Sequence, residues 1–147
     1  MSEDLYAIAE KENIAIEYWN FIPPLEAVYM TLPDGKPMIG LSHSLEKDKR
    51  YKRCVLAEEI GHYYTTVGNC LPVTLFHYRH RLDLSRAEYR AIKWAAEYLM
   101  PINEIRKAFQ DGLWEAWEFA ERFDVTEQFV FFRMTFADIK TLLIEGR

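Results

Sequence analysis

Long apolar runs, a secretion signal and closely spaced cysteines are all missing from this sequence of 147 residues. No stretch approaches the roughly 20 apolar residues of a membrane-spanning helix. The first residues, "MSEDLYAIAEKENI", lack the charged-then-apolar order of a secretion signal. Cys54 and Cys70 are too far apart for a C-x-x-C site. We therefore expect a cytoplasmic protein with reduced thiols and no membrane contact.

An excess of positive charge is also absent. The formal net charge is −5, whereas a protein that binds nucleic acid needs a cationic face for the phosphates. We therefore expect no direct nucleic-acid partner. Half of the residues are apolar, which is enough for one compact domain with a substantial core over residues 1–147.

The first third of the chain, about residues 1–49, predicts a short helix followed by a small sheet. Apolar residues recur at helical spacing between Ser2 and Asn13. The segments "IAIEYW", "EAVYMTL" and "PMIGLS" are typical of strands, and "PDGK" between the last two is turn chemistry. We expect a small antiparallel meander.

The remaining residues predict helices, which makes the fold class α+β. We expect a helix over about 50–66, a loop to about residue 84, and a helix that a capping box of Ser85 and Glu88 opens and Pro101 closes. These helices form a region of about 50–101. The stretches "LWEAWEFAERF" and "TEQFVFFRMTFADIK" then predict a helical pair within 102–147.

The run "LAEEIGHYY" in the central helix carries the chemistry. Residues four apart lie on one helix face, so Glu58 and His62 converge there, with Glu59 beside them. A zinc peptidase helix uses H-E-x-x-H in this way: two ligands hold zinc and the intervening glutamate takes a proton from bound water. The alternative is a solvated acidic face, but the apolar flanks favour burial. Gly61 would let another element approach closely.

A glutamate in place of the first histidine changes the expected metal chemistry. A carboxylate can bind zinc, so Glu58 is admissible as a ligand. Its negative charge should raise the pKa of metal-bound water, and an oxygen-rich site would shift the preference towards manganese or magnesium. The sequence is therefore compatible with zinc, with manganese or with no metal.

Three stretches together resemble the ImmA/IrrE family of cytosolic zinc metallo-endopeptidases of bacteria, phages and mobile elements. They are "PMIGLS", "LAEEIGHYY" and "AAEYLMP", in this order. The resemblance implies a small antiparallel sheet against a helical, gluzincin-like core. It also implies that zinc-activated water cleaves a repressor or a related regulator.

Carried over by position, the resemblance makes Glu59 the general base and His62 a ligand, with Glu58 at the first ligand position. Counting back from Pro101 places the third ligand position at Arg90, and arginine cannot bind a cation. Glu58 and Arg90 could therefore form an ion pair in place of the metal. Alternatively, Glu88 is the third ligand, although its capping box with Ser85 is the favoured interpretation.

Two histidines and the C-terminal helices leave further alternatives open. His77 and His80 in "FHYRHR" could reach a metal, but we expect an exposed aromatic-basic loop. The helices around Asp124 to Thr126 have the outline of a helix-turn-helix without basic residues early in the second helix, which favours packing or protein contact over DNA reading. Their aromatic residues would lie in the core or, if exposed, anchor a partner. These residues are Trp114, Trp117, Phe119 and Phe123.

Two functions follow from these observations. The first is a divergent zinc-dependent endopeptidase with a repressor-type transcription factor as its substrate. The alternative is a non-catalytic regulator of the same fold that binds a transcription factor without a metal.

Overall fold

The computed structural model describes residues 4–66, 73–79 and 83–145, which form an α+β fold as expected. The chain divides into two compact units, residues 1–95 and 96–147, which are described separately below. The expectation of one domain over 1–147 stays a prediction. The elements of the first unit and of the helix that leaves it are α1 (Leu5–Lys11), β1 (Ala15–Trp19), β2 (Leu25–Thr31), β3 (Pro37–Ser42), a 3-10 helix (His43–Lys47), α2 (Lys49–Thr66), β4 (Thr74–Tyr78) and α3 (Arg86–Leu99).

The centre of the sheet is the hairpin that the turn chemistry predicts. Strands β2 and β3 pair antiparallel, with Ala27 opposite Leu41 and Tyr29 opposite Ile39. The turn between them places Gly35 at φ +88°, a conformation that residues with a side chain rarely adopt. The Asp34 carboxylate accepts a hydrogen bond from the backbone N–H of Lys36 at 3.0 Å and closes the turn.

The rest of the sheet differs from the expected antiparallel meander. The strand order is β1-β3-β2-β4, and β1 pairs parallel with β3, so the sheet is mixed. Strand β4 lies in the segment where we expected a loop, and it pairs antiparallel with β2. Gly68, Asn69 and Pro72 end the preceding helix, and we extended the expected loop from them to residue 84. Residues 74–78, however, are largely strand formers.

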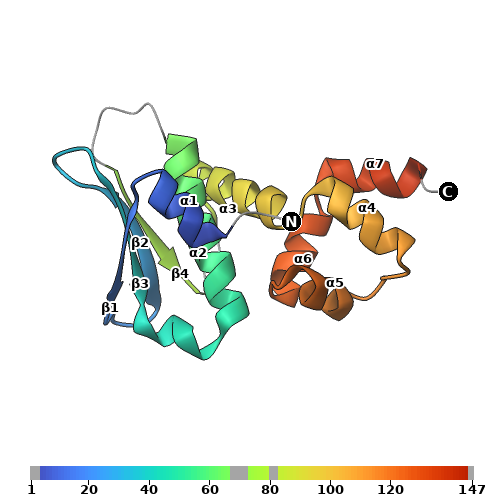
Figure 1. Cartoon of the computed structure of the whole chain (residues 1–147), viewed down its shortest axis with the longest axis horizontal. Helices are drawn as coiled ribbons and strands as arrows, with labels where there is room; N and C mark the ends of the chain where they lie inside the picture. The colour runs from blue at the N-terminus through green and yellow to red at the C-terminus, as the bar shows by residue number, and fades with distance from the viewer. Residues whose placement is uncertain (1–3, 67–72, 80–82, 146–147) are drawn as a thin grey trace. The chain divides into compact units, whose positions relative to one another are not determined.

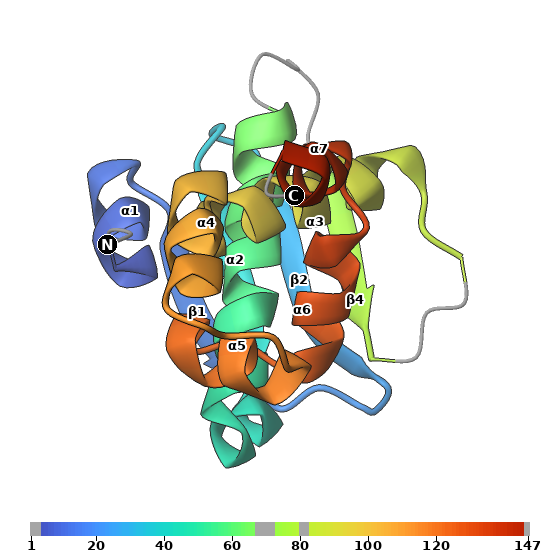
Figure 2. The ribbon, with the colours of Figure 1, turned by 90° about the vertical axis from the view of Figure 1, so that its right-hand side faces the viewer.

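Helix α2 crosses one face of this sheet and contacts β2 and β3 (Figures 1 and 2). Its residues 54–62 are all buried, including the free thiol Cys54. Cys70 lies outside the described residues. Helix α3 crosses α2 at Gly61, where an added Cβ would overlap the backbone carbonyl oxygen of Ala91. The glycine therefore sets the close approach of α3 to α2.

The second unit contains the helices α4 (Ile102–Gln110), α5 (Ala116–Phe123), α6 (Glu127–Met134) and α7 (Ala137–Glu145). We expected a helical pair here. Helix α4 was not foreseen, and the stretch "TEQFVFFRMTFADIK" divides into α6 and α7 at Thr135 and Phe136. Between α5 and α6, Asp124 adopts φ +55° and Thr126 caps α6, which gives the expected three-residue turn.

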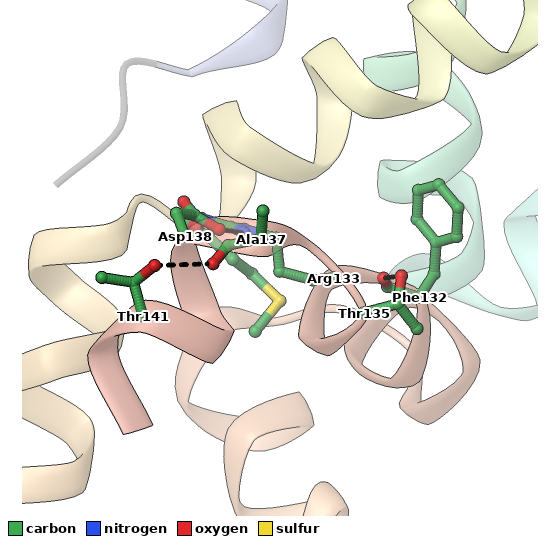
Figure 3. A network of polar contacts seen from close by, with 7 residues as sticks. Phe132, Arg133, Thr135, Ala137, Asp138 and Thr141 are labelled. Atoms are coloured by element: carbon green, nitrogen blue, oxygen red, sulfur yellow. Dashed lines mark hydrogen bonds and ion pairs between the residues drawn. The ribbon is translucent and has the colours of Figure 1, made fainter. Parts of the chain in front are cut away.

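A buried arginine fastens the corner between α6 and α7 (Figure 3). The side chain of Arg133 is 1% exposed and donates two hydrogen bonds to the Asp138 carboxylate, at 2.8 and 2.9 Å. Its Nε donates to the backbone carbonyl of Met100 at 2.8 Å. A buried guanidinium needs such partners, because an unpaired charge in the interior is costly.

No helix among the described residues is long and apolar enough to cross a membrane.

The close contact between α2 and α3 predicts whether an alanine at position 61 stabilises or destabilises the fold. Alanine usually stabilises an interior helix position by about 1 kcal/mol relative to glycine. At Gly61 the new methyl group would overlap the Ala91 carbonyl, and overpacking of this kind costs about 1–3 kcal/mol. We expect Gly61→Ala to lower the free energy of unfolding, measured by urea denaturation. A variant more stable than the wild type would contradict the close helix crossing.

Candidate functional site

Four titratable side chains are buried where α2 faces the end of the sheet. Helix α2 supplies Glu58, Glu59 and His62, and strand β4 supplies His77. Their exposed fractions are 2%, 0%, 1% and 5%, respectively. The expectation from the apolar flanks of "EEIGH" is therefore confirmed, because the acidic pair lies in the core. Buried carboxylates need a partner of opposite charge or several hydrogen bonds.

His77 supplies that partner for both carboxylates. Its Nδ1 lies 3.1 Å from Oε2 of Glu58 and 3.6 Å from Oε1 of Glu59. Strand register explains the reach: His77 lies opposite Ala27 on β2, two residues from Tyr29, whose ring stacks on His62 with centroids 6.2 Å apart. His77 therefore sits on the sheet face that α2 covers.

The second ring nitrogen of His77 is also engaged. Its Nε2 lies 3.3 Å from the hydroxyl oxygen of Tyr51, at the start of α2. The guanidinium of Arg79 lies over the Tyr51 ring, 4.3 Å from its centroid, and donates to the Glu26 carboxylate at 2.6 Å. A chain of polar groups thus leads from the buried acids to Arg79, whose side chain is 46% exposed.

The two nearby carboxylates favour the protonated, positively charged form of His77. Nδ1 of His77 lies 3.1 Å from Oε2 of Glu58, which is an ion-pair distance, although the geometry is not that of a hydrogen bond. Burial and a hydrogen bond to Glu26 raise the pKa of Tyr51, which keeps its hydroxyl protonated, and its oxygen can accept from Nε2 of His77. Burial lowers the pKa of His77, but the contacts with Glu58 and Glu59 outweigh burial and raise it to about 9.

Other residues that the sequence singled out lie elsewhere. Glu88 and Ser85 form the expected capping box, with both backbone-to-side-chain hydrogen bonds at 3.2 Å. Arg90 is exposed on α3. The structure does not bring Arg90 to Glu58 as the ion-pair hypothesis required, since Glu58 is buried and pairs with His77.

The expectation of an exposed loop around His77 is wrong. His77 is the buried position of β4, whose neighbours Phe76 and Tyr78 are 42% and 39% exposed. The signal in the sequence was the run "VTLFHY", which is rich in strand-forming residues and places His77 on the face opposite to its neighbours. His80, the other histidine of that segment, lies outside the described residues.

The described residues do not fit a zinc centre. They contain no group of three His, Cys, Asp or Glu side chains arranged to hold a metal ion. Glu58 contacts the imidazole of His77, Glu88 caps α3, and Arg90 cannot be a ligand. Two cavities, of about 460 and 350 Å³, are lined by other residues. Neither Glu58 nor Glu59 lines either of these two cavities.

The comparison with known families agrees with the resemblance in the motifs. A peptidase family model, described as the IrrE N-terminal-like domain, matches residues 9–135. The chain belongs to this family. No match is found among curated proteins.

The buried residues of α2 can now be compared with the metal-binding motif of the family. By the resemblance of "LAEEIGHYY" to the family motif, Glu59 and His62 are predicted to stand at the positions of the general base and of a histidine ligand. Both are buried on α2. Glu58, which the resemblance predicts at the first ligand position, lies beside the histidine of β4. The chain is metallopeptidase-like in family and fold, whereas its donor set differs from that of a zinc peptidase.

The raised pKa of His77 predicts how stability changes with pH. The pKa is about 6.5 in the unfolded chain and about 9 in the folded protein, so the folded state holds the proton more tightly. This stabilisation is complete below pH 6.5 and is lost as the pH rises through 9. Its size is roughly 3 kcal/mol at about 1.4 kcal/mol per pKa unit.

We expect urea denaturation to show a decline in stability between pH 6.5 and 9.5 that is absent in His77→Gln. The exposed histidine at position 43 provides the matched control, and His43→Gln should keep the wild-type profile. Parallel profiles for the wild type and His77→Gln would contradict the assignment of a positive charge to His77.

Proposed function

We propose that this member of the IrrE-like family is a metal-independent regulator that binds a protein instead of cutting it. The contact of His77 with Glu58 and Glu59 carries the proposal. A peptidase of this family needs the acids to face a metal, water and a substrate. Here their partner is an imidazole, and both carboxylates are at most 2% exposed.

The proposed partner is a repressor-type transcription factor in the cytoplasm, as the family resemblance implies. Three large aromatic side chains of the second unit support binding to a protein. Trp114, Trp117 and Phe131 are 70%, 56% and 63% exposed, whereas Phe119 lies in the core. Exposed aromatic residues are the type that concentrates binding energy at protein interfaces. The early exposed positions of α6 are Glu127 and Gln128, which gives no basic surface for DNA.

The second candidate is a divergent endopeptidase that uses zinc or manganese. Glu59 as general base and His62 as ligand favour it, because both are kept on one turn of α2. In this candidate Glu58 is the first ligand. A donor that completes the site is not found among the described residues.

Metal content separates the two candidates. We expect untagged protein, purified without added metal or chelator, to contain far less than one zinc or manganese per chain by elemental mass spectrometry. Its melting temperature should be unchanged by a chelator. Incubation with purified repressor-type transcription factors should give complexes in which neither protein is cut, and Glu59→Gln should behave as the wild type does.

The opposite result would support the endopeptidase. Near one metal per chain that is lost in His62→Ala, together with cleavage that Glu59→Gln abolishes, would overturn the metal-independent function.

The exposed tryptophans give a separate prediction for the complex. Replacing both in Trp114→Ser/Trp117→Ser should weaken binding of the transcription factor about tenfold or more, since buried aromatic anchors contribute roughly 2 kcal/mol or more. The melting temperature should change little, because both side chains are exposed. Isothermal titration calorimetry measures the affinity. Ile22→Ser, at an 85% exposed apolar residue of the first unit, is the control, and equal weakening by this change would argue against the tryptophans as the anchor.

A further inference from the structure

Two exposed tryptophans lie where α5 begins in the second unit (Figure 1). Trp114 belongs to the connection from α4, and Trp117 belongs to the first turn of α5. Their side chains are 70% and 56% exposed. Leaving two indole rings in water is unfavourable, because each ring exposes a large apolar area. Neighbouring apolar side chains that stay exposed therefore indicate a surface that a partner covers.

Trp114 is held in place before any partner binds. Its backbone N–H donates to the Glu118 carboxylate at 2.9 Å, and the same carboxylate accepts from the N–H of Glu115 at 2.9 Å. Its ring lies against Phe109, with centroids 5.3 Å apart, and Phe109 packs on the buried ring of Phe119. A side chain that is already ordered loses less conformational entropy on binding, which suits an anchor.

The surface around the two indoles is acidic. The 14 residues that precede Arg122 include no Lys, Arg or His, and Arg122 itself pairs with Asp111 at 2.9 Å. Glu115 and Glu121 are exposed, and Glu121 follows Trp117 by one turn on the same face of α5. A partner that covers the tryptophans therefore meets carboxylates beside them.

These features fit a basic segment of the partner. The face of an indole ring attracts Lys and Arg side chains, and neighbouring carboxylates add charge-assisted contacts. In a transcription factor, the cationic surface is the one that contacts the phosphates of DNA. The part of the proposed partner that best complements this acidic, aromatic surface is therefore its DNA-contacting segment.

We propose that the surface formed by Trp114, Trp117, Glu115 and Glu121 binds the basic DNA-contacting segment of the transcription factor, so that the factor cannot hold this protein and its operator DNA together. The inference rests on the function proposed above and adds how the regulator acts. Binding alone then releases the operator, without cleavage of the factor.

The test measures competition between this protein and DNA. A repressor-type transcription factor is bound to its fluorescently labelled operator duplex, and anisotropy follows release of the duplex as this protein is added. A second probe does not depend on the choice of factor. It is a synthetic helical peptide with arginines along one face, compared with a copy that carries glutamines in their place, and isothermal titration calorimetry measures the affinity of both.

A pair of charge variants separates local charge from net charge. Glu115→Gln/Glu121→Gln removes two carboxylates from the surface and keeps Glu118, whose carboxylate fixes the backbone of the anchor. Glu10→Gln/Glu145→Gln is the matched control, because both of these acids are exposed and lie outside the surface. The two double variants lose the same net charge, and both should keep the melting temperature of the wild type.

We expect the wild type to release the operator and to bind the arginine peptide more tightly than the glutamine peptide. Glu115→Gln/Glu121→Gln should weaken operator release and arginine-peptide binding about fivefold or more, as expected for the loss of two exposed ion pairs. Added salt should weaken binding by the wild type, since exposed charges are screened. The control variant should behave as the wild type does.

The other outcomes separate this inference from the proposed function. A complex in which the factor still holds its operator would overturn the inference and leave the metal-independent binding function intact. Equal weakening by the two double variants would do the same, because the effect would then belong to net charge. If no factor binds and the wild type also fails to bind the arginine peptide, both the inference and the proposed binding function are overturned.

Discussion

The burial of two adjacent carboxylates on α2 is the constraint on which the first unit depends. Glu58 and Glu59 lie in the middle of a helix segment whose residues 54–62 are all buried, so neither carboxylate can turn to solvent. His77 from β4 lies beside both carboxylates, and its protonated form offsets at most one of the two negative charges. This contact joins α2 to β4, which follows it in the chain. The packing of β4 on the sheet therefore determines where the charge of His77 lies relative to the two acids of α2.

The same contact affects Glu59, the residue at the position of the general base. A general base must accept a proton from a water molecule that it touches. In this chain Oε1 of Glu59 lies 3.6 Å from Nδ1 of His77. The motif resemblance predicts a general base at position 59, and the structure places this carboxylate beside the histidine of β4.

Local patterns in the sequence were sufficient for much of this fold. The central helix, the β2–β3 hairpin and the capping box of Ser85 and Glu88 were all expected, because each depends on residues close together in the chain. The partner of Glu58 was not foreseen. Charge complementarity suggested Arg90, but only the pairing of β4 with β2, which is a long-range contact, places a histidine beside the acids. The parallel pairing of β1 with β3 escaped prediction for the same reason, since the periodicity of one strand does not specify its neighbour.

The strand order carries a consequence for motion. Strand β4 is at the edge of the described sheet and has only β2 as a neighbour. Its backbone can therefore separate from the sheet by breaking a single ladder of hydrogen bonds, whereas β2 would have to break two. The side chain of His77 opposes this separation because the strand cannot leave without breaking its contacts with Glu58 and Glu59. The rate of amide hydrogen exchange in β4 should therefore depend on the contacts of His77 with Glu58 and Glu59. Slower exchange at this edge would mean that α2 and β4 separate less often.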